Sequence, residues 1–135
     1  EGPVFIRLSG DEYDPNGNSV EDIQKIGALC LNLGVCLLNI SSGGFANIPS
    51  IGPLYQVHLA DQMKKATKGL VATAGLITET EQIANIIDSN QSDIVLLGRK
   101  FLQDPYFLLQ WRYKLGLLEE KDVFIYMYRG LRSLK

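Results

Sequence analysis

Four apolar runs typical of buried strands alternate along the chain with segments of helical periodicity, and this alternation strongly constrains the fold. The runs are Val4–Leu8, Val35–Ile40, Gly69–Ala74 and Asp93–Leu97. Strands separated by helical segments pair in parallel through crossover connections, because tight hairpins cannot join them. A chain of 135 residues is long enough for one modest domain with a core. The sequence therefore predicts an α/β fold with a parallel sheet.

Capping signals mark where the predicted helices begin. Ser19 with Asp22, and Thr78 with Glu81, have the spacing of capping boxes, and Asp104–Pro105 has that of an N-cap followed by a first helical residue. The predicted helices are Val20–Leu33, closed by Gly34, then Leu54–Ala66, a segment with Ile83, Ile86 and Ile87, and one with Trp111. The aromatic side chains of the last helix are expected in the core.

Two glycine turns follow the third and fourth predicted strands and indicate a phosphate site. They are Ala74-Gly75-Leu76 and Leu97-Gly98-Arg99. Glycine lets the backbone approach a ligand closely, and two consecutive βα turns of this kind form the phosphate site of (β/α)₈ barrels. Arg99 adds a fixed positive charge, with a surface salt bridge as the alternative role. Simple steric demands of tight turns are the alternative for both glycines.

A long loop from Ser41 to Pro53 is rich in Gly, Ser, Asn and Pro. Loops of this length in compact folds are usually functional. Ser41 and Ser42 have the alternative role of a simple ST-turn at a strand exit. We expect the loop at the carboxyl end of the sheet.

Composition excludes several classes of function. The formal net charge of −2 argues against a nucleic-acid surface, and no apolar run approaches the length of a membrane span. Cys30 and Cys36 lack metal-ligand spacing, so no metal site is predicted and the cysteines are interpreted as reduced thiols of a cytoplasmic protein.

Four βα units do not close a barrel. The chain starts Glu1-Gly2-Pro3, without methionine, and enters a strand almost at once. We interpret this as a cut inside a larger domain, with a processed start or a partial record as the alternative. Either the sheet is an open, doubly wound one, or a second half of the barrel comes from elsewhere.

Four motifs follow one another along the chain. They are Phe5-Ile6-Arg7-Leu8-Ser9, Ser41-Ser42-Gly43 with Tyr55-Gln56, Gly75-Leu76-Ile77-Thr78, and Leu97-Gly98-Arg99-Lys100-Phe101-Leu102 followed by Asp104-Pro105. In this order and spacing they resemble the old yellow enzymes, which are FMN-dependent NAD(P)H oxidoreductases or ene-reductases, and in particular their thermophilic-like branch. The similarity runs from Pro3 to about Gly116.

The resemblance implies the C-terminal half of a TIM (β/α)₈ barrel, strands five to eight with their helices, over residues 1–118. It implies that Arg7 binds the N1/C2=O edge of the flavin; pairing with a carboxylate is the alternative role. The implied cofactor-binding residues are Arg7, Ala74, Gly75, Leu76, Leu97, Gly98 and Arg99. FMN is the implied cofactor, NAD(P)H the reductant, and an activated alkene or another small electron acceptor the substrate.

No catalytic residue is assigned, because the family's substrate-orienting pair and proton-donating tyrosine belong to the other half of the barrel. His58, the single histidine, does not match that pair and is interpreted as a surface or packing residue. Residues 119–135 form a tail with a possible subunit contact. Arg129-Gly130 resembles a tail motif that reaches a neighbouring subunit's active site, which implies a homo-oligomer.

Two other functions stay open. The chain could be a non-catalytic half-barrel that self-associates or complements a missing N-terminal half. It could also be another FMN barrel, such as a dihydroorotate-dehydrogenase-like enzyme, although the block from Gly98 to Pro105 argues against this.

Overall fold

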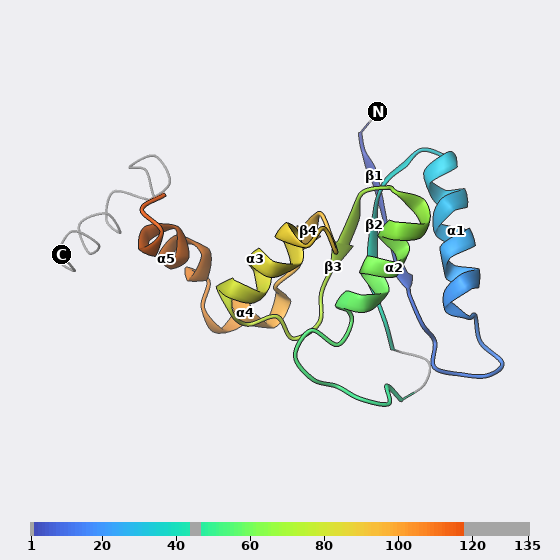
Figure 1. Cartoon of the computed structure of the whole chain (residues 1–135), viewed down its shortest axis with the longest axis horizontal. Helices are drawn as coiled ribbons and strands as arrows, with labels where there is room; N and C mark the ends of the chain where they lie inside the picture. The colour runs from blue at the N-terminus through green and yellow to red at the C-terminus, as the bar shows by residue number, and fades with distance from the viewer. Residues whose placement is uncertain (1, 44–46, 118–135) are drawn as a thin grey trace. The chain divides into compact units, whose positions relative to one another are not determined.

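The computed structural model of the chain describes residues 2–43 and 47–117. The chain divides into two compact units, Glu1–Leu97 and Gly98–Lys135. Among the described residues, the first unit contains four strands and three helices, and the second contains two further helices (Figure 1). We describe each unit by itself.

The first unit is built on a four-stranded parallel sheet, which confirms the predicted fold class. The strands are β1 (Val4–Ser9), β2 (Val35–Ser41), β3 (Val71–Thr73) and β4 (Ile94–Val95), adjacent in chain order. The last two strands are shorter than predicted. Backbone pairing nevertheless continues past β4, because the N–H of Leu96 donates to the carbonyl of Thr73 at 2.8 Å.

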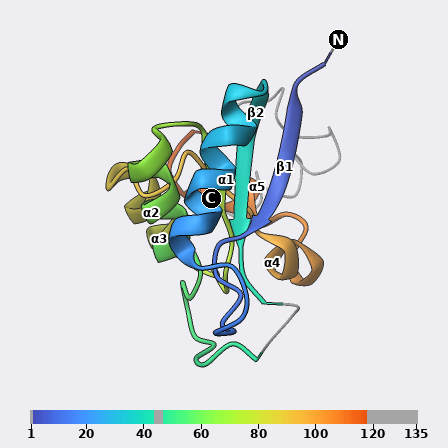
Figure 2. The same ribbon diagram turned by 90° about the vertical axis from the view of Figure 1, so that its right-hand side faces the viewer.

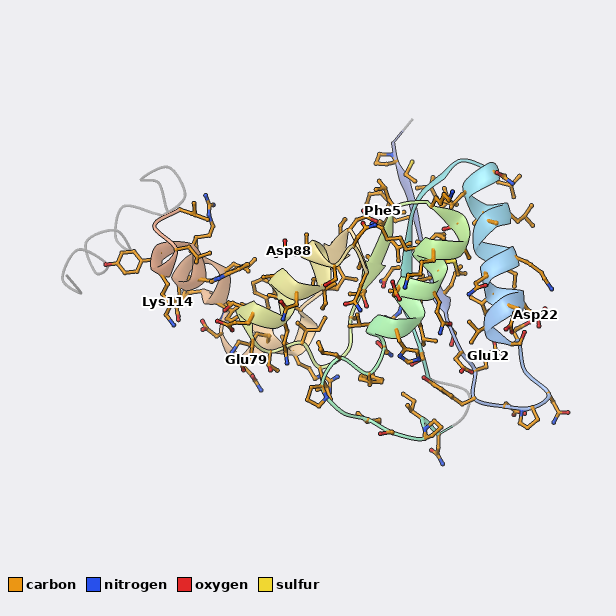
Figure 3. All side chains as sticks on the ribbon, in the orientation of Figure 1. Phe5, Glu12, Asp22, Glu79, Asp88 and Lys114 are labelled. Carbon is orange, nitrogen blue, oxygen red and sulfur yellow. The ribbon has the colours of Figure 1, made fainter. Side chains whose placement is uncertain are left out.

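Helices α1 (Val20–Asn32), α2 (Val57–Thr67) and α3 (Thr80–Asp88) connect or follow these strands. The capping box predicted for α1 is confirmed, since Ser19 Oγ accepts from the Asp22 N–H and an Asp22 carboxylate oxygen accepts from the Ser19 N–H, both at 3.2 Å. Gly34 follows the helix with φ of +97°. Figure 3 labels Asp22 at the start of α1.

The start of α3 differs from its prediction by one residue. The N-cap is Glu79 instead of Thr78, and the residue that completes the cap is Gln82 instead of Glu81. Gln82 Oε1 accepts from the backbone N–H groups of Thr78 and Glu79 at 2.9 and 3.2 Å. A single amide oxygen thereby binds two free N–H groups at the helix start, and this determines where the helix begins.

The core lies between the sheet and helices α1 and α2, which lie on the same side of it (Figure 2). Helix α1 packs on β1 and β2, and α2 packs on β2 and β3. Its most buried members come from the two central strands and both helices: Ile23, Leu38, Ile40, Leu59, Ala60, Met63 and Val71. Ile6 and Leu8 of β1 pack against this cluster. We call this side of the sheet the helix face. Leu33, predicted on the buried side of α1, is 78% exposed because the helix has already ended at that point.

The opposite side of the sheet, the open face, carries the alternate residues of the same strands. One row across it contains Arg7, Asn39, Ala72 and Ile94, which are register partners on successive strands. Phe5 and Ile94 on this face are 63% and 43% exposed. Arg7 is also exposed.

An ion pair ties α2 to the segment before β4. Lys64 Nζ lies 2.5 Å from Asp93 Oδ1, and Asp93 Oδ2 accepts from the backbone N–H of Val71 at 2.9 Å. Burial alone would raise the pKa of Asp93, but the hydrogen bonds from Lys64 and Val71 outweigh it and the pKa lies below the ordinary 3.8.

The second unit contains α4 (Gly98–Gln103) and α5 (Phe107–Lys114). The predicted start of the last helix at Asp104–Pro105 is wrong by two residues, because the N-cap is Tyr106. Asp104 forms a turn instead, its carboxylate accepting from the Tyr106 N–H at 3.0 Å. Neither helix has a buried residue within the part of the chain described, so the prediction of a core position for Trp111 is wrong there.

Candidate functional site

Polar side chains gather in the first unit where β1, β2 and β3 end. The carboxyl ends of parallel strands lie at one edge of a sheet, and ligands of α/β folds bind there. The loops that follow β1 and β2 both contribute to this group. The site is therefore built from segments far apart in the sequence and brought together by the sheet.

Arg7 and Ser41 form the first contact of this site. Arg7 Nε donates to Ser41 Oγ at 2.7 Å, and Ser41 is 5% exposed. The side chain of Arg7 forms no ion pair with any described residue, so the carboxylate-paired alternative is wrong for this part of the chain. Among the described residues only Nε of Arg7 is engaged, so its two terminal guanidinium nitrogens have no partner in that part of the chain.

Ser42, Gln56 and Tyr13 form the second contact. Gln56 Nε2 donates to the Ser42 carbonyl at 3.0 Å and to Ser42 Oγ at 3.1 Å, and Tyr13 Oη donates to the same Oγ at 3.2 Å. Ser42 and Gln56 are 8% and 3% exposed. Gln56 precedes α2 without capping it, because its side chain binds the loop after β2. Ser42 therefore bonds to residues remote in the sequence, whereas in a simple ST-turn it would bond only to neighbouring backbone groups.

The turn after β3 lies against the same group. Gly75 has φ of +124°, and a Cβ atom there would lie 3.0 Å from the backbone nitrogen of Gln56 and 3.4 Å from Cδ1 of Tyr55. Leu76 follows with φ of +51°. The predicted glycine turn therefore has both a conformation that disfavours side chains and a close neighbour that leaves no room for one.

Asn39 contributes a buried acceptor on the open face, beside Arg7 in the sheet register. Its Oδ1 atom is buried and has no hydrogen-bond partner among the described residues. A buried polar atom without a partner is uncommon and costs free energy.

The remaining predicted residues lie elsewhere. Ala74 and Leu76 are partly buried and Leu97 is 8% exposed, whereas Gly98 and Arg99 are exposed residues of α4 in the second unit. Arg99 has no ion pair among the residues described, which removes its surface-salt-bridge alternative there. Arg129 lies outside the described residues.

His58 is exposed on α2, in agreement with its interpretation as a surface residue. Within the described ranges, no group of His, Cys, Asp and Glu is arranged to hold a metal ion, and no helix is long and apolar enough to cross a membrane.

Sequence reasoning missed the roles of Tyr13 and Asn39. Tyr13 lies in a loop rich in Gly, Asp and Pro, where a single aromatic residue was a usable signal. Asn39 is the one polar residue in the apolar run of β2, and a polar residue at such a position indicates a possible site. Their partners are not close in sequence, since Tyr13 and Ser42 are 29 residues apart.

The residues present fit a phosphorylated flavin. Gly75 supplies a turn without a side chain, Arg7 supplies a cation, and Ser41 and Ser42 supply buried hydroxyls. A flavin with ring carbonyl oxygens, a hydroxylated chain and a phosphate has acceptors for these kinds of donor.

Two curated bacterial relatives are proteins named NADPH dehydrogenase. One from Listeria welshimeri is 32% identical over 117 residues, which cover 86% of this chain and 35% of the relative. One from Bacillus cytotoxicus is 36% identical over 110 residues, covering 79% of this chain and 31% of the relative. The chain thus spans about a third of the length of the relatives it matches. No family model matches the chain.

Solved structures agree on the fold. A structure of 2-naphthoyl-CoA reductase with 2-naphthoyl-CoA superposes with a TM-score of 0.68 at 25% identity, covering 82% of this chain and 17% of that one. Histamine dehydrogenase from Rhizobium sp. 4-9 superposes with a TM-score of 0.66 at 18% identity, covering 85% and 17%. Both matches occupy a small part of a longer chain, which agrees with a portion of a larger barrel. The parallel α/β unit, its motifs and these relatives together confirm the resemblance to the old yellow enzyme family, and the chain is a homologue of the NADPH dehydrogenases over most of its own length.

Proposed function

We propose that the chain is the C-terminal portion of an FMN-dependent NAD(P)H oxidoreductase of the ene-reductase kind and supplies part of its flavin site. The observation that carries this proposal is the meeting of Arg7, Ser41–Ser42, Gln56 and the Gly75 turn at the carboxyl ends of three strands. The names of the relatives support the same class of reaction.

Arg7 is proposed to bind the N1/C2=O edge of the flavin. Its Nε donates to Ser41 Oγ, which restrains the guanidinium plane and leaves its two terminal nitrogens as donors for the ligand. A fixed cation at this edge would stabilise the negative charge that a reduced flavin carries at N1. FMN, when bound, supplies the transfer of a hydride from NAD(P)H to an activated alkene or another acceptor.

Gly75 with its neighbours Ala74 and Leu76 is proposed to bind the phosphate through backbone N–H groups. The sequence motif assigns Leu97, Gly98 and Arg99 to the same phosphate, with Arg99 as its charged partner. Free backbone donors and an arginine fork are the groups that bind phosphate oxygens most strongly.

The proposal extends to the partners of the whole enzyme. We infer a cytoplasmic homo-oligomer in which Arg129 contributes to a neighbouring subunit's site, and no catalytic acid or base from this chain. The family resemblance supports these points.

Titration of FMN and riboflavin, followed by flavin fluorescence, tests the proposal. Arg99→Ala removes one charge-assisted phosphate contact, so FMN affinity should fall about tenfold while riboflavin affinity stays the same. Lys114→Ala is the matched control, because it removes the same charge from an exposed position of the second unit. Equal FMN affinity in both variants, or no FMN binding by the unmodified chain, would overturn the proposal.

One observation favours a second function, a non-catalytic module that associates through its sheet. Phe5 and Ile94 are exposed on the open face, and exposed apolar sheet faces promote association. Sedimentation velocity with flavin absorbance separates the two functions. A flavin-free oligomer supports the module, and a flavin-loaded chain supports the oxidoreductase.

A further inference from the structure

Tyr13 is a residue of the site that the proposed function does not use. It lies in the loop between β1 and α1, with φ of +53°, a conformation that is uncommon for a residue with a side chain. Its backbone N–H donates to Asp11 Oδ1 at 2.8 Å. Ser9 Oγ in turn donates to the Asp11 carbonyl at 3.1 Å. The loop therefore holds the tyrosine in place directly after β1.

Ser42 Oγ is the point at which two donors meet. It accepts from Tyr13 Oη at 3.2 Å and from Gln56 Nε2 at 3.1 Å. A hydroxyl oxygen has two lone pairs and one proton, so these two bonds occupy both lone pairs. The Ser42 hydroxyl can then form a further hydrogen bond only through its proton, as a donor. Tyr13 thus makes a buried serine a hydrogen-bond donor.

Ser42 is connected both toward Arg7, through its neighbour Ser41, and toward the Gly75 turn, through its hydrogen bond with Gln56. Ser42 follows Ser41, whose hydroxyl accepts from Arg7 Nε. Gln56 lies against the Gly75 turn, since its backbone nitrogen is 3.0 Å from the place where a Cβ of Gly75 would be. Tyr13, Ser42 and Gln56 therefore connect the loops after β1 and β2 to the turn after β3.

We infer that Tyr13 is a positioning residue, whose phenol acts through Ser42 to orient the Ser42 and Gln56 side chains between Arg7 and the Gly75 turn. The inference rests on the proposed function, because FMN is the ligand that Arg7 and the Gly75 turn are proposed to bind. Tyr13 itself contacts no part of the ligand in this role. Its contribution is a hydroxyl that prevents the site from rearranging before binding.

The test compares FMN dissociation constants of Tyr13→Phe, Ser42→Ala and the double variant. Tyr13→Phe removes one neutral hydrogen bond and keeps the ring, so affinity should fall about five- to tenfold. Because Tyr13 acts through Ser42, the double variant should bind as weakly as Ser42→Ala alone. Tyr106→Phe is the matched control, since Tyr106 is 52% exposed in the second unit, and it should leave affinity unchanged.

Equal affinity of Tyr13→Phe and the unmodified chain, or additive losses in the double variant, would overturn the inference. A readout without ligand separates it from the proposed function. NMR hydrogen exchange of the Gln56 side-chain amide should be slow in the unmodified chain and faster in Tyr13→Phe. If the unmodified chain does not bind FMN, the proposed function fails, and this exchange measurement alone supports or overturns the positioning role.

Discussion

The helix face and the open face of the sheet are made from the same four strands but have different tasks. On the helix face, Leu38, Ile40 and Val71 are fully buried against α1 and α2. On the open face, Phe5 and Ile94 are exposed, and Arg7 carries a charge at the end of β1. Alternating residues of one strand thus pack into the core on one side of the sheet, and on the other side they are exposed to solvent or to a ligand.

Because the two faces differ in this way, substitutions on the helix face should mainly affect stability, and substitutions at the carboxyl edge of the open face should mainly affect binding. The free energy of folding comes mainly from apolar area removed from water, which is concentrated on the helix face. The polar groups at the carboxyl edge contribute little to the core and are free to serve a ligand. Three predictions test this separation.

The largest expected effect is on the helix face. Leu38→Ala should lower the free energy of unfolding by about 3 kcal/mol, because it leaves a cavity beneath two helices. Leu37→Ala is the matched control: the same residue type next along β2, 8% exposed and on the other side of the sheet, should lose about half as much. Denaturant unfolding measures both. Equal losses would show that the two faces are covered equally.

A smaller effect is expected at the turn after β3. Gly75→Ala should cost about 2 kcal/mol of stability, because its positive φ and the nearby Gln56 nitrogen both oppose a side chain. Gly34→Ala shares the positive φ but has no neighbour within 4 Å, so it should cost only about 1 kcal/mol. Thermal unfolding gives both values. FMN binding should weaken in the first variant alone, and an unchanged affinity would separate this turn from the phosphate.

The smallest effect concerns the ion pair between Lys64 and Asp93. Asp93→Asn should cost about 1 kcal/mol at neutral pH, more than Asp61→Asn, whose partner Lys65 is largely exposed. The pKa of Asp93 is lowered by its hydrogen bonds, so its contribution is present above pH 3.8 and is lost as pH falls further.

Unfolding midpoints at pH 7 and below pH 3.8 check this pH dependence. The unmodified chain should lose more stability between the two conditions than Asp93→Asn does, because the variant has no carboxylate to protonate. A variant with the same acid loss would show that Asp93 does not contribute.

Much of the fold could be predicted because its signals are local. Ser19 and Asp22 lie in one helical turn, so their capping box is readable from spacing alone. The start of α3 was harder, since Gln82 competes with Glu81 for the same N–H groups and only three-dimensional geometry selects between them. Trp111 was misjudged because aromatic content predicts burial only when another element covers it.

The candidate site was predictable residue by residue but not as an arrangement. Gly75 was identified from its place at a strand end and Arg7 from the family resemblance, whereas the hydrogen bond from Arg7 to a serine hydroxyl was not predicted. Tyr13 and Gln56 meet at Ser42 from 29 and 14 residues away. Sequence periodicity does not predict hydrogen bonds between residues so far apart in the chain.

The parallel order of strands and helices, the glycine turns and the family resemblance are all readable from the order of the residues. These follow from chain connectivity and from backbone preferences that act over a few residues. Which face of the sheet is covered, and that the Ser42 hydroxyl accepts from two donors, became known from the folded chain. Burial and hydrogen-bond partners depend on distances between segments remote in sequence, and these distances exist only once the sheet has assembled.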